Sequence, residues 1–128
     1  MAYDYDDDNV FAKILRGEIP NKTVLETDHT LAFEDIGPQA PVHVLVIPKG
    51  AYVDYAHFAA QASEAEIVDF NRTVAEVCRM TGIGPCDDGG GFRAITNAGE
   101  DGVQEVQHYH LHILGGRPLG RMLARAPG

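Results

Sequence analysis

Three histidines at alternate positions form the most chemically distinctive stretch of this chain. His108, His110 and His112 lie within HYHLHILGG, and the 128-residue chain has only six histidines. The apolar residues around them are typical of a buried β-strand. A buried neutral imidazole needs hydrogen-bonding partners for both ring nitrogens. The stretch therefore predicts either a satisfied polar row or a binding site.

Side chains alternate between the two faces of a strand, so the three histidines should share one face. Tyr109, Leu111 and Ile113 should share the other. Successive imidazoles on one face then begin about 7 Å apart, from a rise of ~3.3 Å per residue. Neighbouring pairs can converge on one small ligand, and the whole row can line a slot for a phosphate and its substituent.

This row has three chemical interpretations. It can be a satisfied polar row on a half-exposed sheet face. It can be a metal site, because imidazole is a common ligand and His43 or a carboxylate could complete the set. It can also be a nucleophilic site, where an imidazole attacks phosphorus and leaves a nucleotidyl-histidine that water cleaves.

Composition and charge exclude several classes of function. A length of 128 residues suits one domain, and 45% hydrophobic residues are enough for a core. The formal net charge of −9 argues against a nucleic-acid partner, which needs a basic surface. The sequence has no apolar stretch near the roughly 20 residues of a membrane span and no signal-peptide pattern. Cys78 and Cys86 form no Cys-x-x-Cys, which favours reduced thiols and a cytoplasmic location.

The expected elements alternate between helices and short strands. We expect an acidic, flexible arm over residues 1–8 and a single domain over 9–128. Ser63 and Glu66 predict a capping box at the start of a helix. The periodicity and the turn residues predict helices over 9–17 and 63–82 and strands over 23–36 (a hairpin), 42–48, 92–97 and 106–114. Residues 51–61 are not assigned. This order predicts an α+β fold with about five antiparallel strands and two helices.

The histidine stretch and its flanks resemble the histidine-triad nucleotide-binding family. Residues 108–114 fit the pattern His-φ-His-φ-His-φ-φ, with Tyr109 at the first apolar position. FAKILRGEIP resembles the entrance helix of the family, and LAFEDIGPQAPVHVLVIPK resembles its nucleoside-binding hairpin and central strand. NAGEDGVQEVQHYHLHILGGRPLGRML resembles the catalytic strand and tail of the Hint-like purine nucleoside phosphoramidase branch. The resemblance covers residues 9–123.

The resemblance implies a HIT fold that dimerises into a larger continuous sheet. It implies a hydrolase that cleaves the P–N bond of purine nucleoside 5′-phosphoramidates through a nucleotidyl-histidine, releasing AMP or GMP and an amine. It implies no cofactor, and three of the four zinc-ligand positions of some family members read Asn9, Ala12 and Ala51. A dinucleoside polyphosphate hydrolase and a nucleotide-binding regulatory module with vestigial catalysis are the alternatives.

The resemblance also implies a role for each histidine of the site. His110 corresponds to the nucleophile, and His112 to the group that contacts the phosphate oxygens. His108 and His43 correspond to the residues that support the nucleophile, although His43 could also be a satisfied core histidine. Asp35 corresponds to the carboxylate that holds the ribose hydroxyls.

The remaining expected site residues contact the base or the phosphate. The apolar walls of the base pocket correspond to Phe11, Ile14, Phe33 and Ile36, which ordinary core packing would also explain. The phosphate side corresponds to the Asn97 amide and to the backbone amides of Gln104 and Val106. Glu105 stands where the best-known enzymes of this branch carry a serine, and a carboxylate there would repel a phosphate if it pointed inward.

Overall fold

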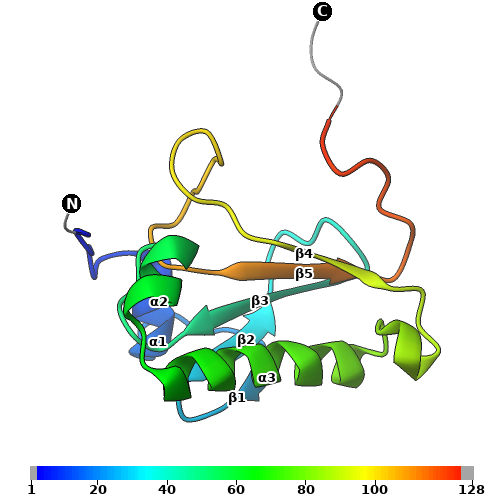
Figure 1. The fold of residues 1–128 in the computed structure, drawn as a ribbon, viewed down its shortest axis with the longest axis horizontal. Coiled ribbons are helices and arrows are strands. Elements are labelled where there is room, and N and C mark those ends of the chain that lie inside the picture. The colour runs from blue at the N-terminus through cyan, green and yellow to red at the C-terminus, as the bar shows by residue number, and fades with distance from the viewer. Residues whose placement is uncertain (1–2, 125–128) are drawn as a thin grey trace, which may run out of the picture.

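The sheet has five antiparallel strands, and the computed structural model describes residues 3–124. The strands are β1 (Thr23–Glu26), β2 (Thr30–Glu34), β3 (Val42–Pro48), β4 (Phe92–Ile95) and β5 (Leu111–Gly115). Their order across the sheet is β1-β2-β3-β5-β4, so β5 lies between β3 and β4 (Figure 1). The predicted α+β fold with an antiparallel sheet is confirmed.

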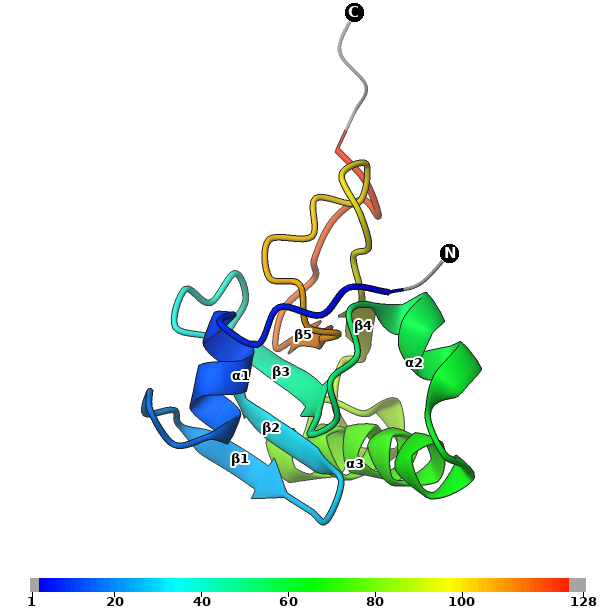
Figure 2. The same cartoon turned by 90° about the vertical axis from the view of Figure 1, so that its left-hand side faces the viewer.

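Helices cover both faces of this sheet (Figure 2). The three α-helices are α1 (Val10–Leu15), α2 (Tyr55–Gln61) and α3 (Glu64–Thr81), and a short 3-10 turn spans Pro85–Asp87. One core cluster joins α3 to the sheet through residues such as Phe70, Val77, Val46 and Ile113. A second cluster joins α1 to the opposite face through Phe11, Phe33, Leu45 and Ile47. The histidines of β3 and β5 therefore face the side of the sheet that α1 covers.

The predicted helix ends are present in the structure. Asn9 caps α1 by accepting from the Ala12 amide. Ser63 and Glu66 form the reciprocal capping box at the start of α3. Gly82 ends α3 with a φ of 69°, a left-handed conformation that glycine adopts without steric cost. Among residues 3–124, no helix combines the length and apolar character needed to cross a bilayer.

The prediction of two helices was wrong, because the unassigned segment 51–61 contains α2. Asp54 caps this helix by accepting from the His57 amide. Phe58 inserts into the core beside Phe70 and Tyr109. The helix has only seven residues, too few for its apolar periodicity to distinguish it from a loop.

The last strand is also shorter than predicted, since β5 begins at Leu111 rather than at residue 106. The pairing of β5 with β3 begins at Leu111, which lies opposite Val46. Before it, the Tyr109 amide leaves the ladder and donates to the Tyr52 carbonyl at 2.8 Å. His108 and His110 therefore lie on an extended segment before the strand, where side chains and loop carbonyls replace the sheet hydrogen bonds.

Residues 3–8 contact the rest of the domain through Tyr3 and Tyr5. Tyr3 stacks on His57 with ring centroids 4.0 Å apart. The Tyr5 hydroxyl lies 2.6 Å from Nδ1 of His108. Figure 2 shows this segment crossing from α1 towards α2. The outermost residues of the two expected segments, 1–2 and 125–128, lie outside the described part of the chain.

Candidate active site

A cavity of about 660 Å³ opens on the α1 side of the sheet. It lies between α1, the ends of β2, β3 and β5, and the loop that connects β4 to β5. Eleven of the thirteen predicted site residues line it: Phe11, Ile14, Phe33, Asp35, Ile36, His43, Asn97, Glu105, Val106, His110 and His112. His108 and Gln104 do not.

The ring of His110 is held in one tautomer by the main chain. Its Nδ1 lies 2.7 Å from the carbonyl oxygen of His108. A carbonyl oxygen can only accept a hydrogen bond, so Nδ1 carries the proton. In the neutral ring, Nε2 then has a free lone pair. The edge of the Phe11 ring contacts His110 with centroids 4.9 Å apart and restricts the imidazole further.

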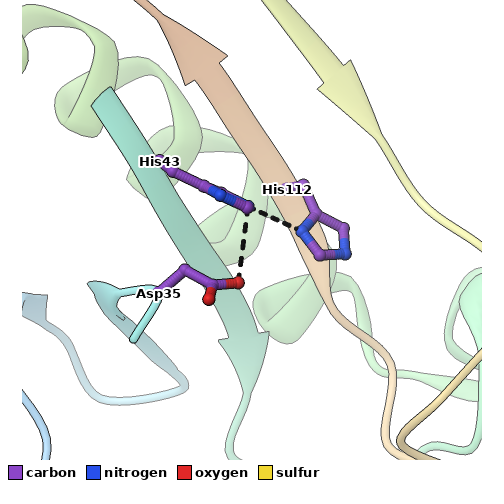
Figure 3. Close-up of side chains that lie close together, drawn as sticks. All are labelled: Asp35, His43 and His112. Atoms are coloured by element: carbon purple, nitrogen blue, oxygen red, sulfur yellow. Dashed lines mark hydrogen bonds and ion pairs between the residues drawn. The ribbon is translucent and has the colours of Figure 1, made fainter. Parts of the chain in front are cut away.

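The hydrogen bond between His43 and His112 (Figure 3) and a second main-chain contact together set the tautomers of both rings. The Gln39 amide donates to Nδ1 of His43 at 3.1 Å, so the proton of His43 is on Nε2. That N–H points at Nδ1 of His112, 2.9 Å away. His112 therefore accepts at Nδ1 and keeps its own proton on Nε2. His112 can donate this proton to an oxygen of a ligand in the cavity.

Asp35 lies at the edge of the same cluster. Its Oδ2 is 3.4 Å from Nε2 of His43, and its Oδ1 accepts from the Gly37 amide at 2.8 Å. The Gly37 contact holds the carboxylate at the cavity. Both Asp35 oxygens retain lone pairs for a ligand, because each carboxylate oxygen can accept more than one hydrogen bond.

His108 is fully buried next to the cavity and does not line it. Its Nε2 lies 2.8 Å from the Pro48 carbonyl oxygen, so Nε2 carries the proton and Nδ1 accepts from Tyr5. Its own carbonyl accepts from His110. His108 therefore contacts His110 through its main chain and does not line the cavity.

Burial keeps these imidazoles neutral. It lowers the pKa of His108 and of His112 to about 4, and neighbouring histidines act in the same direction. Burial also lowers the pKa of His43 and His110, against an opposing effect of Asp35 on both. At neutral pH, His110 therefore presents an unprotonated Nε2 without the help of a separate base.

Asp35, His43 and His112 form a cluster with the spacing of a metal site, with their ligand atoms within 4.8 Å of one another. The hydrogen bonds oppose this use. His43 accepts from a backbone amide at Nδ1, so its Nε2 must keep a proton and has no lone pair for a metal. Metal binding there would break the contact with Gln39.

The apolar walls differ in burial. Phe11 and Phe33 are core residues with their ring centroids 5.7 Å apart. Ile14 is half-buried on α1. Ile36 is fully exposed at the cavity mouth. Phe11 and Phe33 therefore serve both the core and the cavity, whereas Ile36 contributes only to the cavity.

Gln104 does not face the cavity, which corrects the expectation for its backbone amide. That amide donates to the Gly99 carbonyl at 3.1 Å. The side-chain Nε2 donates to the carbonyls of Val53 and Val106, and Oε1 accepts from the Gly99 amide. Gln104 instead ties the β4–β5 loop together and joins it to the segment before α2. Glu105 and Val106, which follow it, line the cavity.

Three contributions to the site were not found in the sequence. The Gln39 amide sets the tautomer of His43, the Tyr5 hydroxyl contacts His108, and Thr96 donates to the His110 carbonyl at 2.8 Å. Two of these contacts link residues more than 10 positions apart. A main-chain donor such as that of Gln39 has no sequence signal, because every residue except proline carries one.

The chain matches known proteins over most of its length. Residues 16–119 match the model of the HIT domain family. An uncharacterised HIT-like protein of Azospirillum brasilense is 58% identical, over 98% of this chain and 99% of that protein. A protein of Escherichia coli K12 named purine nucleoside phosphoramidase is 41% identical, over 92% of this chain and 95% of that protein.

Solved structures show the same fold. A histidine triad protein from Clostridium difficile superimposes with a TM-score of 0.78 at 39% identity, over 92% of this chain and 98% of that one. A HIT family hydrolase from Clostridium thermocellum superimposes with a TM-score of 0.77 at 34% identity, over 92% of this chain and 99% of that one. Together with the histidine geometry, these matches show that the chain belongs to the histidine-triad (HIT) family.

Proposed function

We propose that this chain is a purine nucleoside phosphoramidase that works through a nucleotidyl-histidine on His110. The observation that carries the proposal is the tautomer of His110, whose Nδ1–H is held by the His108 carbonyl so that Nε2 is a free nucleophile at the cavity. The E. coli relative named purine nucleoside phosphoramidase supports the choice of substrate.

The reaction has two displacements at phosphorus. In the first, the Nε2 lone pair forms a bond to the α-phosphorus and the P–N bond of the substrate breaks, with its electron pair leaving on the amine nitrogen. The amine takes up a proton as it leaves. His110 now carries a positive charge, and the hydrogen bond from its Nδ1–H to the His108 carbonyl stabilises that charge. In the second, water attacks phosphorus and the bond from phosphorus to Nε2 breaks, with its electron pair returning to His110. The water gives up a proton to solvent, the nucleoside monophosphate leaves, and His110 is neutral again.

His112 and His43 act together on the phosphate. His112 donates its Nε2–H to a phosphate oxygen, and His43 keeps that proton in place by donating to the other ring nitrogen at 2.9 Å. Because the His43 N–H occupies Nδ1 of His112, His112 stays neutral during this step, and the leaving amine takes its proton from water in the open cavity. Neither displacement requires a metal or another cofactor.

Asp35 and the apolar walls bind the nucleoside. The carboxylate accepts from both ribose hydroxyls, and Phe11, Phe33, Ile14 and Ile36 enclose the base. A 2′-deoxyribose substrate should lose one of two charge-assisted hydrogen bonds, with kcat/KM falling about tenfold. An Asp35→Asn variant should lose most of this discrimination. Equal kcat/KM values for ribose and deoxyribose substrates in the unmodified protein would contradict the assignment of Asp35.

Glu105 favours a second candidate function, a nucleotide-binding module with vestigial catalysis. It lines the cavity and acts electrostatically on His110. A carboxylate there repels a phosphate anion, whereas the Asn97 amide and the Val106 main chain can hold it. A dinucleoside polyphosphate hydrolase is the third candidate, and rates on a diadenosine polyphosphate and on an adenosine phosphoramidate separate it from the first.

The proposal includes a homodimer in the cytoplasm with no nucleic-acid or membrane partner. β4 is an edge strand, and Phe92 on it is 44% exposed. Edge strands need to be covered, and pairing with the same edge of a second copy would form one continuous sheet. Leu123 in the tail also lines the cavity and is exposed. The net charge of −9 opposes binding to nucleic acid or to anionic lipid.

Intact-protein mass spectrometry after rapid, acid-free quenching with an adenosine 5′-phosphoramidate tests the proposal. The unmodified protein should gain a mass of one nucleotide and release AMP. His110→Ala should show neither, yet bind AMP normally, while His29→Ala, a control on an exposed turn, should behave like the unmodified protein. AMP binding without adduct or turnover in the unmodified protein would favour the binding module, and Glu105→Ser would be the next variant.

A further inference from the structure

We propose that Tyr5 is a positioning residue for the nucleophile and acts through His108. The proposal rests on the phosphoramidase activity proposed above. It gives a role in the reaction to the N-terminal segment 3–8, which lies outside the matched HIT domain and outside the cavity. Tyr5 does not contact the space where a substrate would bind.

The Tyr5 hydroxyl is the donor in its contact with His108. The oxygen lies 2.6 Å from Nδ1, and the ring centroids are 5.6 Å apart in an edge arrangement. The Pro48 carbonyl occupies Nε2 of His108 at 2.8 Å and requires a proton there. Nδ1 therefore has only a lone pair, and within residues 3–124 the Tyr5 hydroxyl is the group that donates to it.

Both contacts of His108 matter because its side chain has no access to water. His108 is 0% exposed. If the hydroxyl is removed, a buried acceptor loses its partner, which is far more costly than losing a hydrogen bond at the surface. The ring can then relax only by moving away from Pro48 or by admitting water. We expect a displaced ring to shift the main chain of His108 as well.

Movement of that backbone reaches His110 directly. The carbonyl that fixes the His110 tautomer belongs to His108 itself and lies 2.7 Å from Nδ1 of His110. Phe11 packs edge-on against both rings, with centroids 6.3 Å from His108 and 4.9 Å from His110. A displaced His108 therefore weakens the hold on Nδ1–H and misaligns Nε2 for attack at phosphorus. The effect falls on the chemical step more than on nucleotide binding.

The rest of the segment is anchored independently of the Tyr5 hydroxyl. Tyr3 stacks on His57, and the Asp7 carbonyl accepts from Arg16 at 2.8 Å. Replacement of Tyr5 by phenylalanine keeps the ring and should leave the segment in place. Tyr5→Phe thus isolates the hydroxyl. Tyr3→Phe is the matched control, because it makes the same change in the same segment without touching His108.

Steady-state kinetics with an adenosine phosphoramidate provide the first test. We expect Tyr5→Phe to lower kcat about tenfold and to change KM by less than about twofold, because the nucleoside contacts are unaffected. Tyr3→Phe should match the unmodified protein. In a His108→Ala background, adding Tyr5→Phe should change kcat by less than about twofold, since the residue through which it acts is gone.

Two outcomes would overturn the proposal. One is a kcat for Tyr5→Phe within about twofold of the unmodified protein. The other is an equally large effect of Tyr5→Phe in the presence and absence of the His108 ring, which would mark a general structural role.

Nitrogen-15 NMR of the imidazole rings separates this proposal from the proposed function. The unmodified protein should show His110 protonated at Nδ1 and His108 protonated at Nε2, whether or not it turns over substrate. Tyr5→Phe should shift the His110 ring signals, and Tyr3→Phe should not. If the unmodified protein has no turnover but Tyr5→Phe shifts His110, the enzyme function fails and the positioning role stands. Unchanged His110 signals in Tyr5→Phe would overturn the positioning role.

Discussion

Acidification from pH 7 to pH 5 should destabilise the folded chain, because folding buries histidines in the neutral form. His108 is fully buried, and burial lowers its pKa from 6.5 to about 4. The unfolded chain therefore binds a proton at His108 in a pH range where the folded chain does not. A lowered histidine pKa contributes stability that is complete above pH 6.5 and is lost as pH falls towards 4.

The size of the effect follows from these two values. Each unit of pKa difference is worth about 1.4 kcal/mol, so the free energy of unfolding should fall by about 2 kcal/mol between pH 7 and pH 5 from His108 alone. His43, His110 and His112 have lowered pKa values and act in the same direction. A loss of this size is a large share of the stability of a small domain.

Urea denaturation at half-unit steps between pH 5 and pH 7 measures this loss. This window lies above the range in which carboxylates such as Glu66 and Asp69 become protonated. A change below about 1 kcal/mol across the window, or an NMR titration of His108 with a midpoint near 6.5, would refute the reasoning.

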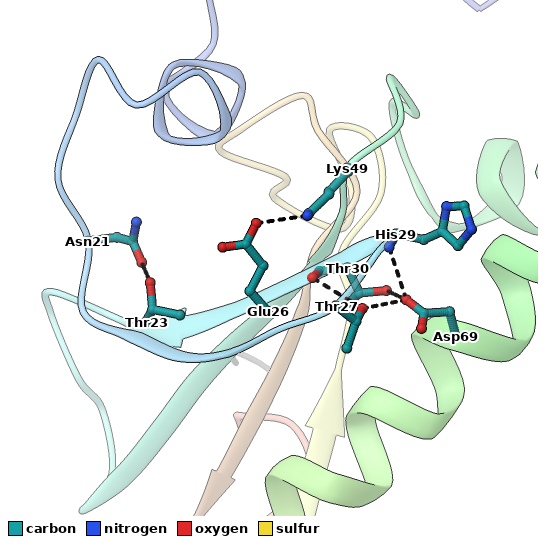
Figure 4. Close-up of polar contacts among 8 residues, drawn as sticks. All are labelled: Asn21, Thr23, Glu26, Thr27, His29, Thr30, Lys49 and Asp69. Atoms are coloured by element: carbon teal, nitrogen blue, oxygen red, sulfur yellow. Dashed lines mark hydrogen bonds and ion pairs between the residues drawn. The ribbon is translucent and has the colours of Figure 1, made fainter.

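Three further predictions concern the contact of Asp69 with the β1–β2 hairpin, the loop after α3 and the pH dependence of the reaction rate. Asp69 on α3 accepts from three groups of the β1–β2 hairpin, including the Oγ1 of fully buried Thr30 at 2.7 Å (Figure 4). Asp69→Ala should lower the free energy of unfolding in urea by about 1–3 kcal/mol, and a loss below about 0.5 kcal/mol would contradict a stabilising role for this contact. A Cβ on Gly89 would lie 2.3 Å from a main-chain oxygen, whereas one on Gly90 would meet nothing within 4 Å; Gly89→Ala should lose about 1–3 kcal/mol and Gly90→Ala should change by less than about 0.5 kcal/mol, and equal melting temperatures would contradict this contrast. The acid limb of kcat/KM should lie below pH 6.5, since the pKa of His110 is lowered by burial; a limb at or above 6.5 would contradict the assignment of a neutral free-enzyme nucleophile.

The strongly patterned elements were predictable because their signals are local. Ser63 and Glu66 are three positions apart, and the capping box they predict is present at the start of α3. The β-branched run in residues 42–48 predicts a central strand, and β3 has those bounds. The histidine pattern with its flanks was enough to identify the family, because a motif of fixed spacing is itself a local feature.

The limits of the last strand depended on tertiary structure. An alternation of side chains extends over residues 106–114, but a strand ends where its partners end. β3 pairs with β5 only as far as Leu111. The short helix α2 was missed for a related reason. Its seven residues are too few to show a helical periodicity, and the helix is stabilised by the packing of Phe58 in the core.

The sequence by itself predicted a set of candidate site residues, namely the triad histidines, His43 and Asp35. Only the tertiary structure decided which nitrogen of each ring is free. The proton positions are set by the carbonyls of Pro48 and His108 and by the amide of Gln39. These main-chain groups are the same in every residue except for the missing amide of proline, so no pattern of side chains reveals where the fold will place them. Tyr5 illustrates the same point, because 103 positions separate it from His108 and only the fold brings the two together.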